Sequence, residues 1–195
     1  IEHPKVLSYL EVLRDKAEVG EKVAIIGAGG IGFDVAEYLT HEGVSTSQNI
    51  PAFMREWGVD MTLTARAGVE GVEARPEPSK RSVTLLQRKS SKPGAGLGKT
   101  TGWIHRLGLQ KRGVAMIRGC NYQKIDDRGL HVLVDEEPKL FEVDNVIICA
   151  GQDPQRELAD GINSKPVHLI GGADVAAELD AKRAIDQGTR LAADI

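Results

Sequence analysis

Short, wholly apolar segments alternate with segments whose apolar positions recur at helical spacing. Residues 23–26 read VAII, a run that is typical of a strand buried on both faces of a parallel sheet. In residues 31–39 the apolar side chains repeat as on one face of a helix. Further buried strands are predicted at 82–87 and 145–149. This alternation predicts an α/β fold built on a parallel sheet.

The two ends of the chain show weaker patterns. Residues 4–16 place apolar side chains at helical spacing and predict a short amphipathic helix. Near the other end, residues 167–170 predict a strand and residues 175–195 a long helix. Gly188 interrupts that helix, at a cost of about 1 kcal/mol relative to alanine. A close approach to another backbone or to a cofactor would offset this cost.

Residues 113–143 change to a period of two with short apolar runs, which is typical of strands with one buried face. The sequence DDRG at 126–129 is typical of a hairpin turn. We therefore expect an antiparallel β-meander inserted before the strand at 145–149. Its predicted strands are residues 114–117, 121–125, 130–134 and 140–143.

The first buried strand is followed by a glycine-rich turn with the spacing G-x-G-x-x-G. Gly27 permits the tight turn, Gly29 lets a pyrophosphate approach the backbone, and Gly32 lets the helix pack closely on the strand. Gly30 and Ile31 begin the helix, whose free amides and dipole favour phosphate. Strand, turn and helix arrive in the order of a dinucleotide-binding βαβ unit. The alternative is a glycine turn with a purely structural role.

Two cations, Arg88 and Lys89, follow the strand at 82–87. In NAD-binding units an acidic residue at this position accepts hydrogen bonds from the ribose 2′-hydroxyl. A guanidinium binds a 2′-phosphate with a planar fork of donors, whereas a carboxylate repels it. The pair therefore favours NADP over NAD. As the alternative, both side chains are solvated residues at a strand end.

Residues 93–100, PGAGLGKT, resemble a phosphate-binding P-loop but do not have its spacing. The pattern G-x-x-x-x-G-K-[ST] requires glycine where Pro93 stands, so ATP or GTP binding is disfavoured. We expect a flexible basic loop near the NADP phosphates, with Lys92, Lys99 or Arg106 as a counter-ion.

The second strand comes late, about fifty residues after Gly32, whereas a βαβ unit usually spans ~30 residues. Residues 41–80 are therefore an insertion. Within it, residues 50–57 predict a short helix and residues 66–80 an irregular surface loop. A loop of this length is usually functional or mobile, and the sequence leaves both open.

Composition limits the classes of function. The 195 residues are 41% hydrophobic and carry a net charge of −3, which favours neither nucleic acid nor an anionic membrane as a partner. No apolar run approaches the ~20 residues that span a bilayer, and no signal peptide is evident. Cys120 and Cys149 lack metal-ligand spacing, so we expect buried free thiols, a cytoplasmic protein and no metal site. Ile1 opens the chain in mid-pattern, and we therefore expect a piece of a longer protein.

Several stretches resemble the C-terminal part of the bacterial NADPH-dependent 2,4-dienoyl-CoA reductases. They read IEHPKVL at 1–7, KTTGWIHR at 99–106, YQKIDD at 122–127 and DVAAELDAKRAIDQG at 174–188. With the glycine turn, the resemblance extends over essentially the whole chain. More distantly, the architecture is similar to that of trimethylamine dehydrogenase and of old-yellow-enzyme-type enoate reductases with appended flavin domains.

The resemblance implies a Rossmann-like three-layer nucleotide-binding domain of the disulfide-reductase-like flavoprotein type, with its antiparallel β-meander inserted before the last parallel strand. Residues 1–19 would be a lead-in helix from an FAD domain. Residues 20–150 would be the NADPH-binding domain with its insertion at 41–80. Residues 151–195 would be the closing strand and helix of the FAD domain. In this family an N-terminal barrel, expected elsewhere in a longer parent chain, carries FMN, a 4Fe-4S cluster and the catalytic residues.

The implied function is that of an oxidoreductase of fatty acid β-oxidation. The chain would present NADPH for hydride transfer to FAD, and electrons would then pass through the iron–sulfur cluster to FMN and a 2,4-dienoyl-CoA. Expected partners are NADPH and the FAD domain and barrel of the same parent chain. This chain would hold no catalytic residue and only part of the FAD site, so it should bind NADPH without turning over. The alternatives are a related flavin and iron–sulfur reductase with another acceptor, and a non-catalytic nucleotide-binding structural module.

The same resemblance assigns roles to further residues. Arg88 and Lys89 match the family's 2′-phosphate end, and the glycine turn matches its pyrophosphate turn. Ala150 and Gly151 match the strand end that leads the chain back toward the flavin. Asp174 matches the acid that contacts the ribityl or pyrophosphate region of FAD in related flavoproteins.

Overall fold

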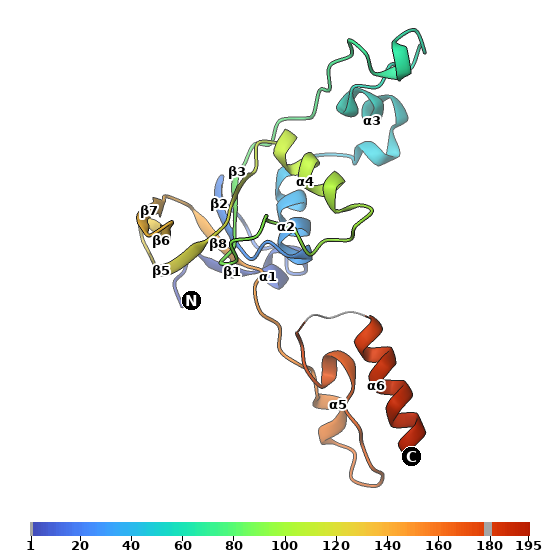
Figure 1. The fold of residues 1–195 in the computed structure, drawn as a ribbon. Helices are drawn as coiled ribbons and strands as arrows, with labels where there is room; N and C mark the ends of the chain where they lie inside the picture. Colours follow the sequence, from blue (N-terminus) through green and yellow to red (C-terminus); the bar gives the residue numbers. More distant parts are fainter. Residues whose placement is uncertain (1, 178–180) are drawn as a thin grey trace. The chain divides into compact units, whose positions relative to one another are not determined.

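The computed structural model describes residues 2–177 and 181–195, which divide into two compact units (Figure 1). The first unit, Ile1–Ala150, contains a five-stranded sheet and a three-stranded sheet. The second unit, Gly151–Ile195, contains helices. None of the helices within the described residues is long and apolar enough to cross a membrane.

The five-stranded sheet is parallel throughout and has the order β1-β8-β2-β3-β4. Its central strand, β2, holds Val23, Ala24 and Ile25, which are at most 1% exposed. This burial on both faces explains the continuous apolar run. The strands are β1 (Val6–Ser8), β2 (Lys22–Ile26), β3 (Ser82–Leu86), β4 (Ala115–Ile117) and β8 (Asn145–Ile148).

The other sheet is an antiparallel meander of β5 (Cys120–Asp126), β6 (Gly129–Val134) and β7 (Glu137–Phe141). The predicted inserted meander and its DDRG turn are thus confirmed. The predicted strand at 114–117 forms as β4, but it pairs in parallel with β3 and belongs to the first sheet. The reason is that a three-residue edge strand carries too short a pattern to show which sheet it joins.

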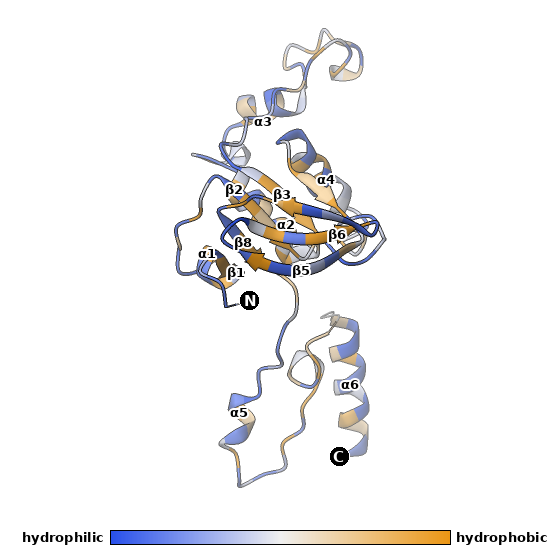
Figure 2. Ribbon diagram, turned by 90° about the vertical axis from the view of Figure 1, so that its left-hand side faces the viewer, coloured by the Kyte–Doolittle hydropathy of each residue, from blue (hydrophilic) through white to orange (hydrophobic). Residues whose placement is uncertain are grey.

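The first unit has three layers, as expected for the predicted fold class. On one face of the parallel sheet, α1 (Tyr9–Leu13), α2 (Gly30–Thr40) and α4 (Gly102–Lys111) pack their apolar sides on residues such as Ile25. On the other face, Ala24 and Val146 pack on Leu130 and Val132 of the meander. Figure 2 shows the hydrophobic colouring along β3, β6 and β8 that accompanies this packing.

The single helix predicted at 4–16 is wrong. Its first part forms β1, which pairs in parallel with β8, and α1 follows directly. Ser8 and Glu11 form a capping box, in which each side chain accepts a hydrogen bond from the other residue's backbone amide. The cap starts the helix at Tyr9, so Val6 and Leu7 are left to the sheet.

The insertion forms α3 (Ile50–Trp57), as predicted, between the 3₁₀ turns η1 (Thr46–Gln48) and η2 (Arg66–Gly68). Glu56 of α3 forms an ion pair of 3.0 Å with Arg112 after α4, and both side chains are nearly buried. The Thr46 hydroxyl donates a second bond of 2.7 Å to Glu56. These contacts attach the first half of the insertion to α4.

The second unit contains α5 (Glu157–Asp160), η3 (Gly171–Ala173) and α6 (Ala181–Asp194). The strand predicted at 167–170 is wrong, because these residues pair with no strand among the described residues. The helix predicted at 175–195 is helical from Ala181 to Asp194; its residues 178–180 lie outside the described part. Gly188 faces the Ile170 side chain, which would lie 3.4 Å from a β-carbon there. That close approach is to a side chain, not to the backbone or cofactor expected.

Candidate nucleotide-binding site

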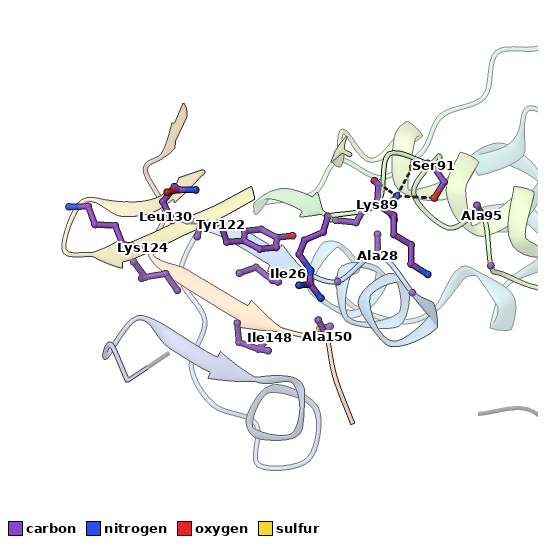
Figure 3. A pocket seen from close by; sticks show the side chains of 18 residues that line it. Ile26, Ala28, Lys89, Ser91, Ala95, Tyr122, Lys124, Leu130, Ile148 and Ala150 are labelled. Carbon is purple, nitrogen blue, oxygen red and sulfur yellow. Dashed lines mark hydrogen bonds between the residues drawn. The ribbon is translucent and has the colours of Figure 1, made fainter. Parts of the chain in front are cut away.

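A pocket of about 830 Å³ lies at the carboxyl ends of β2, β3 and β8 (Figure 3). In the sheet, β2 has β3, the next strand along the chain, on one side and β8, a strand much later in the chain, on the other. The strand order therefore reverses at β2. In open α/β sheets this reversal of strand order creates the crevice where ligands bind. The pocket is lined by Ile26, Gly27, Ala28, Gly29, Gln87, Arg88, Lys89, Ser91, Ala95, Gly96, Tyr122, Gln123, Lys124, Ile125, Leu130, Ile148, Cys149 and Ala150.

Some glycines of the turn after β2 are required by the fold, because a side chain there would clash, and others are not. Gly27 has a φ of +114°, and a β-carbon there would lie 2.8 Å from the Cys149 carbonyl group. A β-carbon at Gly32 would lie 1.8 Å from the Gly27 carbonyl oxygen. At Gly29 and Gly30 a β-carbon would meet nothing within 4 Å. The fold therefore needs the first and last glycines, while the backbone at Gly29 faces open pocket space that a pyrophosphate fits.

The start of α2 is arranged for an anion. Gly29 is the N-cap and supplies no side-chain cap, and the first turn carries no acidic residue. The amides of a first helical turn lack partners within their helix, and the helix dipole places partial positive charge there. Together with the open space at Gly29, this fits the phosphates of a dinucleotide.

Arg88 and Lys89 lie beside this turn and line the same pocket. Both are exposed, and neither forms an ion pair within the described residues. The Gln87 side-chain amide donates to the carbonyls of Lys89, at 3.0 Å, and Ser91, at 2.5 Å, and so braces the chain around the two cations. The site therefore offers two free positive charges on an ordered turn.

The first half of the loop from 92 to 101 uses its backbone amides for hydrogen bonds within the protein. The Gly94 amide donates to the Ala28 carbonyl at 3.1 Å, and the amides of Ala95 and Leu97 donate to carbonyls within the loop. Amides used in this way are not free to bind phosphate. Gly94 also packs on α2, since a β-carbon there would lie 2.6 Å from the Phe33 ring.

The cations predicted for this loop lie elsewhere than expected. Arg106 donates to the carbonyls of Pro93, at 3.0 Å, and Gly94, at 2.9 Å, so it anchors the loop, and it does not line the pocket. Lys99 is exposed and does not line the pocket, and Lys92 does not line it either.

Of the other residues predicted to bind a cofactor, some line the pocket and some do not. Ala150 lines the pocket at the end of β8, and Gly151, with a φ of +88°, is the first residue of the second unit. Ile31 lies within α2 and is not a lining residue. Asp174 lies in the second unit, where its carboxylate accepts a hydrogen bond of 2.8 Å from Gln187.

Sequence reasoning missed the wall that the meander contributes. Tyr122, Gln123, Lys124 and Ile125 of β5 and Leu130 of β6 line the pocket. Their spacing resembles that of any strand with one buried face, so no local signal identifies them. Only the packing of one sheet on the other brings them to the site.

Cys149 is the cysteine that lines the pocket. Burial raises the pKa of the Cys149 thiol to about 12, so the thiol stays protonated at neutral pH and is a poor nucleophile. Among the residues that the structure describes, no three His, Cys, Asp or Glu side chains gather as a set of metal ligands.

Fold and pocket together define a class of protein: a nucleotide-binding unit with a parallel sheet, a glycine turn at the point where strand order reverses, and a meander covering one face. Residues 5–181 match the model of the pyridine nucleotide-disulphide oxidoreductase family, and the chain belongs to this family. Its members are flavoprotein reductases that use NAD(P)H.

Individual relatives are distant. A metal reductase of Desulforamulus reducens is 23% identical over 171 residues, which is 87% of this chain and 24% of that protein. The solved complex of 2-naphthoyl-CoA reductase with 2-naphthoyl-CoA superimposes with a TM-score of 0.64 and 20% identity, over 96% of this chain and 23% of that one. A third similar structure is the Cu(II) complex of the Escherichia coli flavoprotein disulfide reductase RclA, in a cysteine-to-serine mutant. It superimposes with a TM-score of 0.50 and 15% identity, over 94% of this chain and 37% of that one. The chain thus spans about a quarter of the length of the first two.

Proposed function

We propose that this chain is the NADP(H)-binding part of a larger flavoprotein reductase and that it presents NADPH for hydride transfer to FAD. One observation carries the proposal. The open backbone at Gly29 and the free cations Arg88 and Lys89 line a single pocket, at the place where an α/β sheet binds nucleotides.

The residues have distinct roles in this proposal. Gly29 and the first amides of α2 hold the pyrophosphate, and Gly27 and Gly32 shape the turn that presents them. Arg88 holds the 2′-phosphate with its guanidinium fork, assisted by Lys89. Bound NADPH supplies the hydride, while this chain fixes the position of the cofactor and neutralises its phosphates.

We also propose an electron acceptor for the longer protein of which this chain is a part. The acceptor is a 2,4-dienoyl-CoA, reached through FAD, a 4Fe-4S cluster and FMN that other parts of a longer chain hold. The stretches at 99–106 and 122–127 support it, because they resemble the dienoyl-CoA reductases. A structural neighbour that binds 2-naphthoyl-CoA is consistent with an acyl-CoA acceptor, whereas the metal reductase relative favours another acceptor.

The division of the chain is part of the same proposal. Residues 20–150 form the NADPH-binding domain, and the preceding β1 and α1 pack in the same compact unit. Residues 151–195 close an FAD domain in which Asp174 approaches the flavin nucleotide. The carboxylate of Asp174 is held by Gln187, and Arg156 donates to the backbone carbonyl of Asp174, so its conformation is defined within the second unit.

Calorimetric titration with NADPH and, separately, with NADH tests the nucleotide assignment. Selective binding of NADPH supports it, and equal binding of both cofactors contradicts the role of Arg88. Steady-state assays of the full-length protein with NADPH and a 2,4-dienoyl-CoA then test the acceptor. A full-length protein that binds NADPH but transfers no electrons to any acceptor would favour a structural nucleotide module.

A further inference from the structure

The pocket has a second wall that the phosphate-binding residues do not use. Tyr122 and Ile125 of β5, Leu130 of β6, and Ile26 and Ile148 at the ends of two parallel strands line this side. Figure 3 shows the Tyr122 ring reaching from the meander toward the middle of the pocket, between Leu130 on one side and Lys89 on the other. This wall is mostly apolar, and its one phenolic hydroxyl belongs to Tyr122. Two polar residues of β5, Gln123 and Lys124, also line it, and the Lys124 ammonium is paired with Asp126 at 2.8 Å.

The backbone of β5 is irregular where it forms this wall. Tyr122 pairs with Val132 and Lys124 pairs with His131, so Gln123 is an extra residue that makes a β-bulge. In a regular strand, successive side chains point to opposite faces, and alternate residues would point away from the pocket. The bulge lets consecutive residues from Tyr122 to Ile125 line it. Bulges beside binding sites commonly redirect a side chain in this way.

The Tyr122 hydroxyl is buried and finds no hydrogen-bond partner among the described residues. Burial raises the pKa of Tyr122, and the positive charge of Arg88 opposes that rise only in part. The phenol therefore stays neutral and is a hydrogen-bond donor at physiological pH. A buried donor without a partner is unfavourable, and a bound ligand with an acceptor removes the penalty.

We propose that Tyr122 binds the adenine base of the dinucleotide, with its hydroxyl donating to a ring nitrogen and the apolar wall covering the base. The inference rests on the proposed function, which places the 2′-phosphate at Arg88. The same ribose carries both the 2′-phosphate and the adenine, so the base lies next to Arg88, where Tyr122 stands. A flat base with acceptor nitrogens suits a mostly apolar wall whose buried hydroxyl has no partner, whereas a phosphate would place its charge against apolar side chains.

Arg88 connects the two parts of this site. The hydroxyl is buried in the absence of nucleotide, so an adenine reaches it only when a neighbouring side chain moves. Arg88 is exposed, and its charge acts on the Tyr122 hydroxyl. In this proposal, Arg88 therefore moves toward the 2′-phosphate and exposes the hydroxyl to the base.

Tyr122→Phe removes the hydroxyl and keeps the ring. We expect binding of NADPH, NADH and adenosine 2′,5′-bisphosphate to weaken alike, by about three- to tenfold in calorimetric titration, the size expected for one neutral hydrogen bond. Binding of nicotinamide mononucleotide stays unchanged. Without ligand, the melting temperature of the variant is equal to or above that of the original protein, because the variant loses an unsatisfied buried donor.

The matched control is Tyr38→Phe on α2, at a tyrosine that is 44% exposed and lies outside the pocket; it should change none of these affinities. Unchanged nucleotide affinity in Tyr122→Phe, with the original protein binding NADPH, overturns this inference alone. Weaker binding of NADPH but not of NADH overturns the adenine assignment, since it places the hydroxyl at the 2′-phosphate. Failure of the original protein to bind either cofactor overturns the proposed function and this inference with it.

Discussion

Gly32 lies so close to Gly27 that a β-carbon on Gly32 would stand 1.8 Å from the Gly27 carbonyl oxygen. This contact joins the first turn of α2 to the end of β2 and sets the direction in which the helix leaves the sheet. The glycine between them, Gly29, has no such constraint. The two kinds of glycine therefore predict opposite phenotypes when substituted.

Gly32→Ala should destabilise the fold. The added methyl group has no space, and overpacking of this kind costs about 1–3 kcal/mol. Urea denaturation followed by circular dichroism measures the loss in the free energy of unfolding. A variant as stable as the original protein would contradict the contact described here.

Gly29→Val should leave the fold intact and weaken nucleotide binding. Its side chain enters the open space into which the pyrophosphate fits, so NADPH affinity should fall by at least about tenfold, or 1.4 kcal/mol. Circular dichroism and calorimetry, performed on the same preparation, separate the two effects. Retained affinity in a folded variant would exclude a pyrophosphate at this turn.

Arg88→Glu should weaken NADPH binding far more than NADH binding. The substitution removes a charge-assisted contact and puts a carboxylate against the 2′-phosphate, so we expect a loss of about 1.5–3 kcal/mol for NADPH and a much smaller one for NADH. Arg75→Glu makes the same charge change at an exposed position of the insertion that does not line the pocket, and it should affect neither cofactor. Equal losses of both cofactors in Arg88→Glu would rule out 2′-phosphate recognition.

Arg112→Met should loosen the insertion, because it leaves the nearly buried Glu56 carboxylate without its partner. Breaking a buried pair from one side costs about 3–5 kcal/mol. Urea denaturation and limited proteolysis of residues 41–80 measure the effect. The double variant Glu56→Gln/Arg112→Met should recover much of the loss, and no recovery would mean that the loss does not come from the unpaired Glu56 charge.

Cys149 should make the stability of the first unit depend on alkaline pH. Burial raises the pKa of its thiol from 9.0 to about 12, so between these values the unfolded chain binds fewer protons than the folded one. Stability therefore falls as the pH rises through this window, by at most about 1.4 kcal/mol per pH unit. Urea denaturation from pH 8 to 11 should show a smaller fall in Cys149→Ala. Parallel curves for the two proteins would contradict the burial of the thiol.

The sequence by itself determined the structural features that depend only on residues close together in the chain. The apolar run of β2, the glycine turn after it and the hairpin turn at 126–129 are local, because backbone geometry and burial on both faces act within a few residues. The strand, turn and helix order also indicated the end of the sheet at which the pocket lies. Arg88 and Lys89 could be placed there because they directly follow a strand of that sheet.

Only the tertiary structure decided the features that depend on partners distant in the chain. Residues 6–8 pair with β8 instead of extending a helix, and residues 167–170 stay unpaired within the described part, because a strand needs a neighbour that periodicity does not reveal. Arg106 of α4 donates to two carbonyls of the preceding loop, and Tyr122 reaches the pocket from a second sheet. The environment of a side chain depends on the elements that pack against it. The local sequence pattern does not show which distant elements those are.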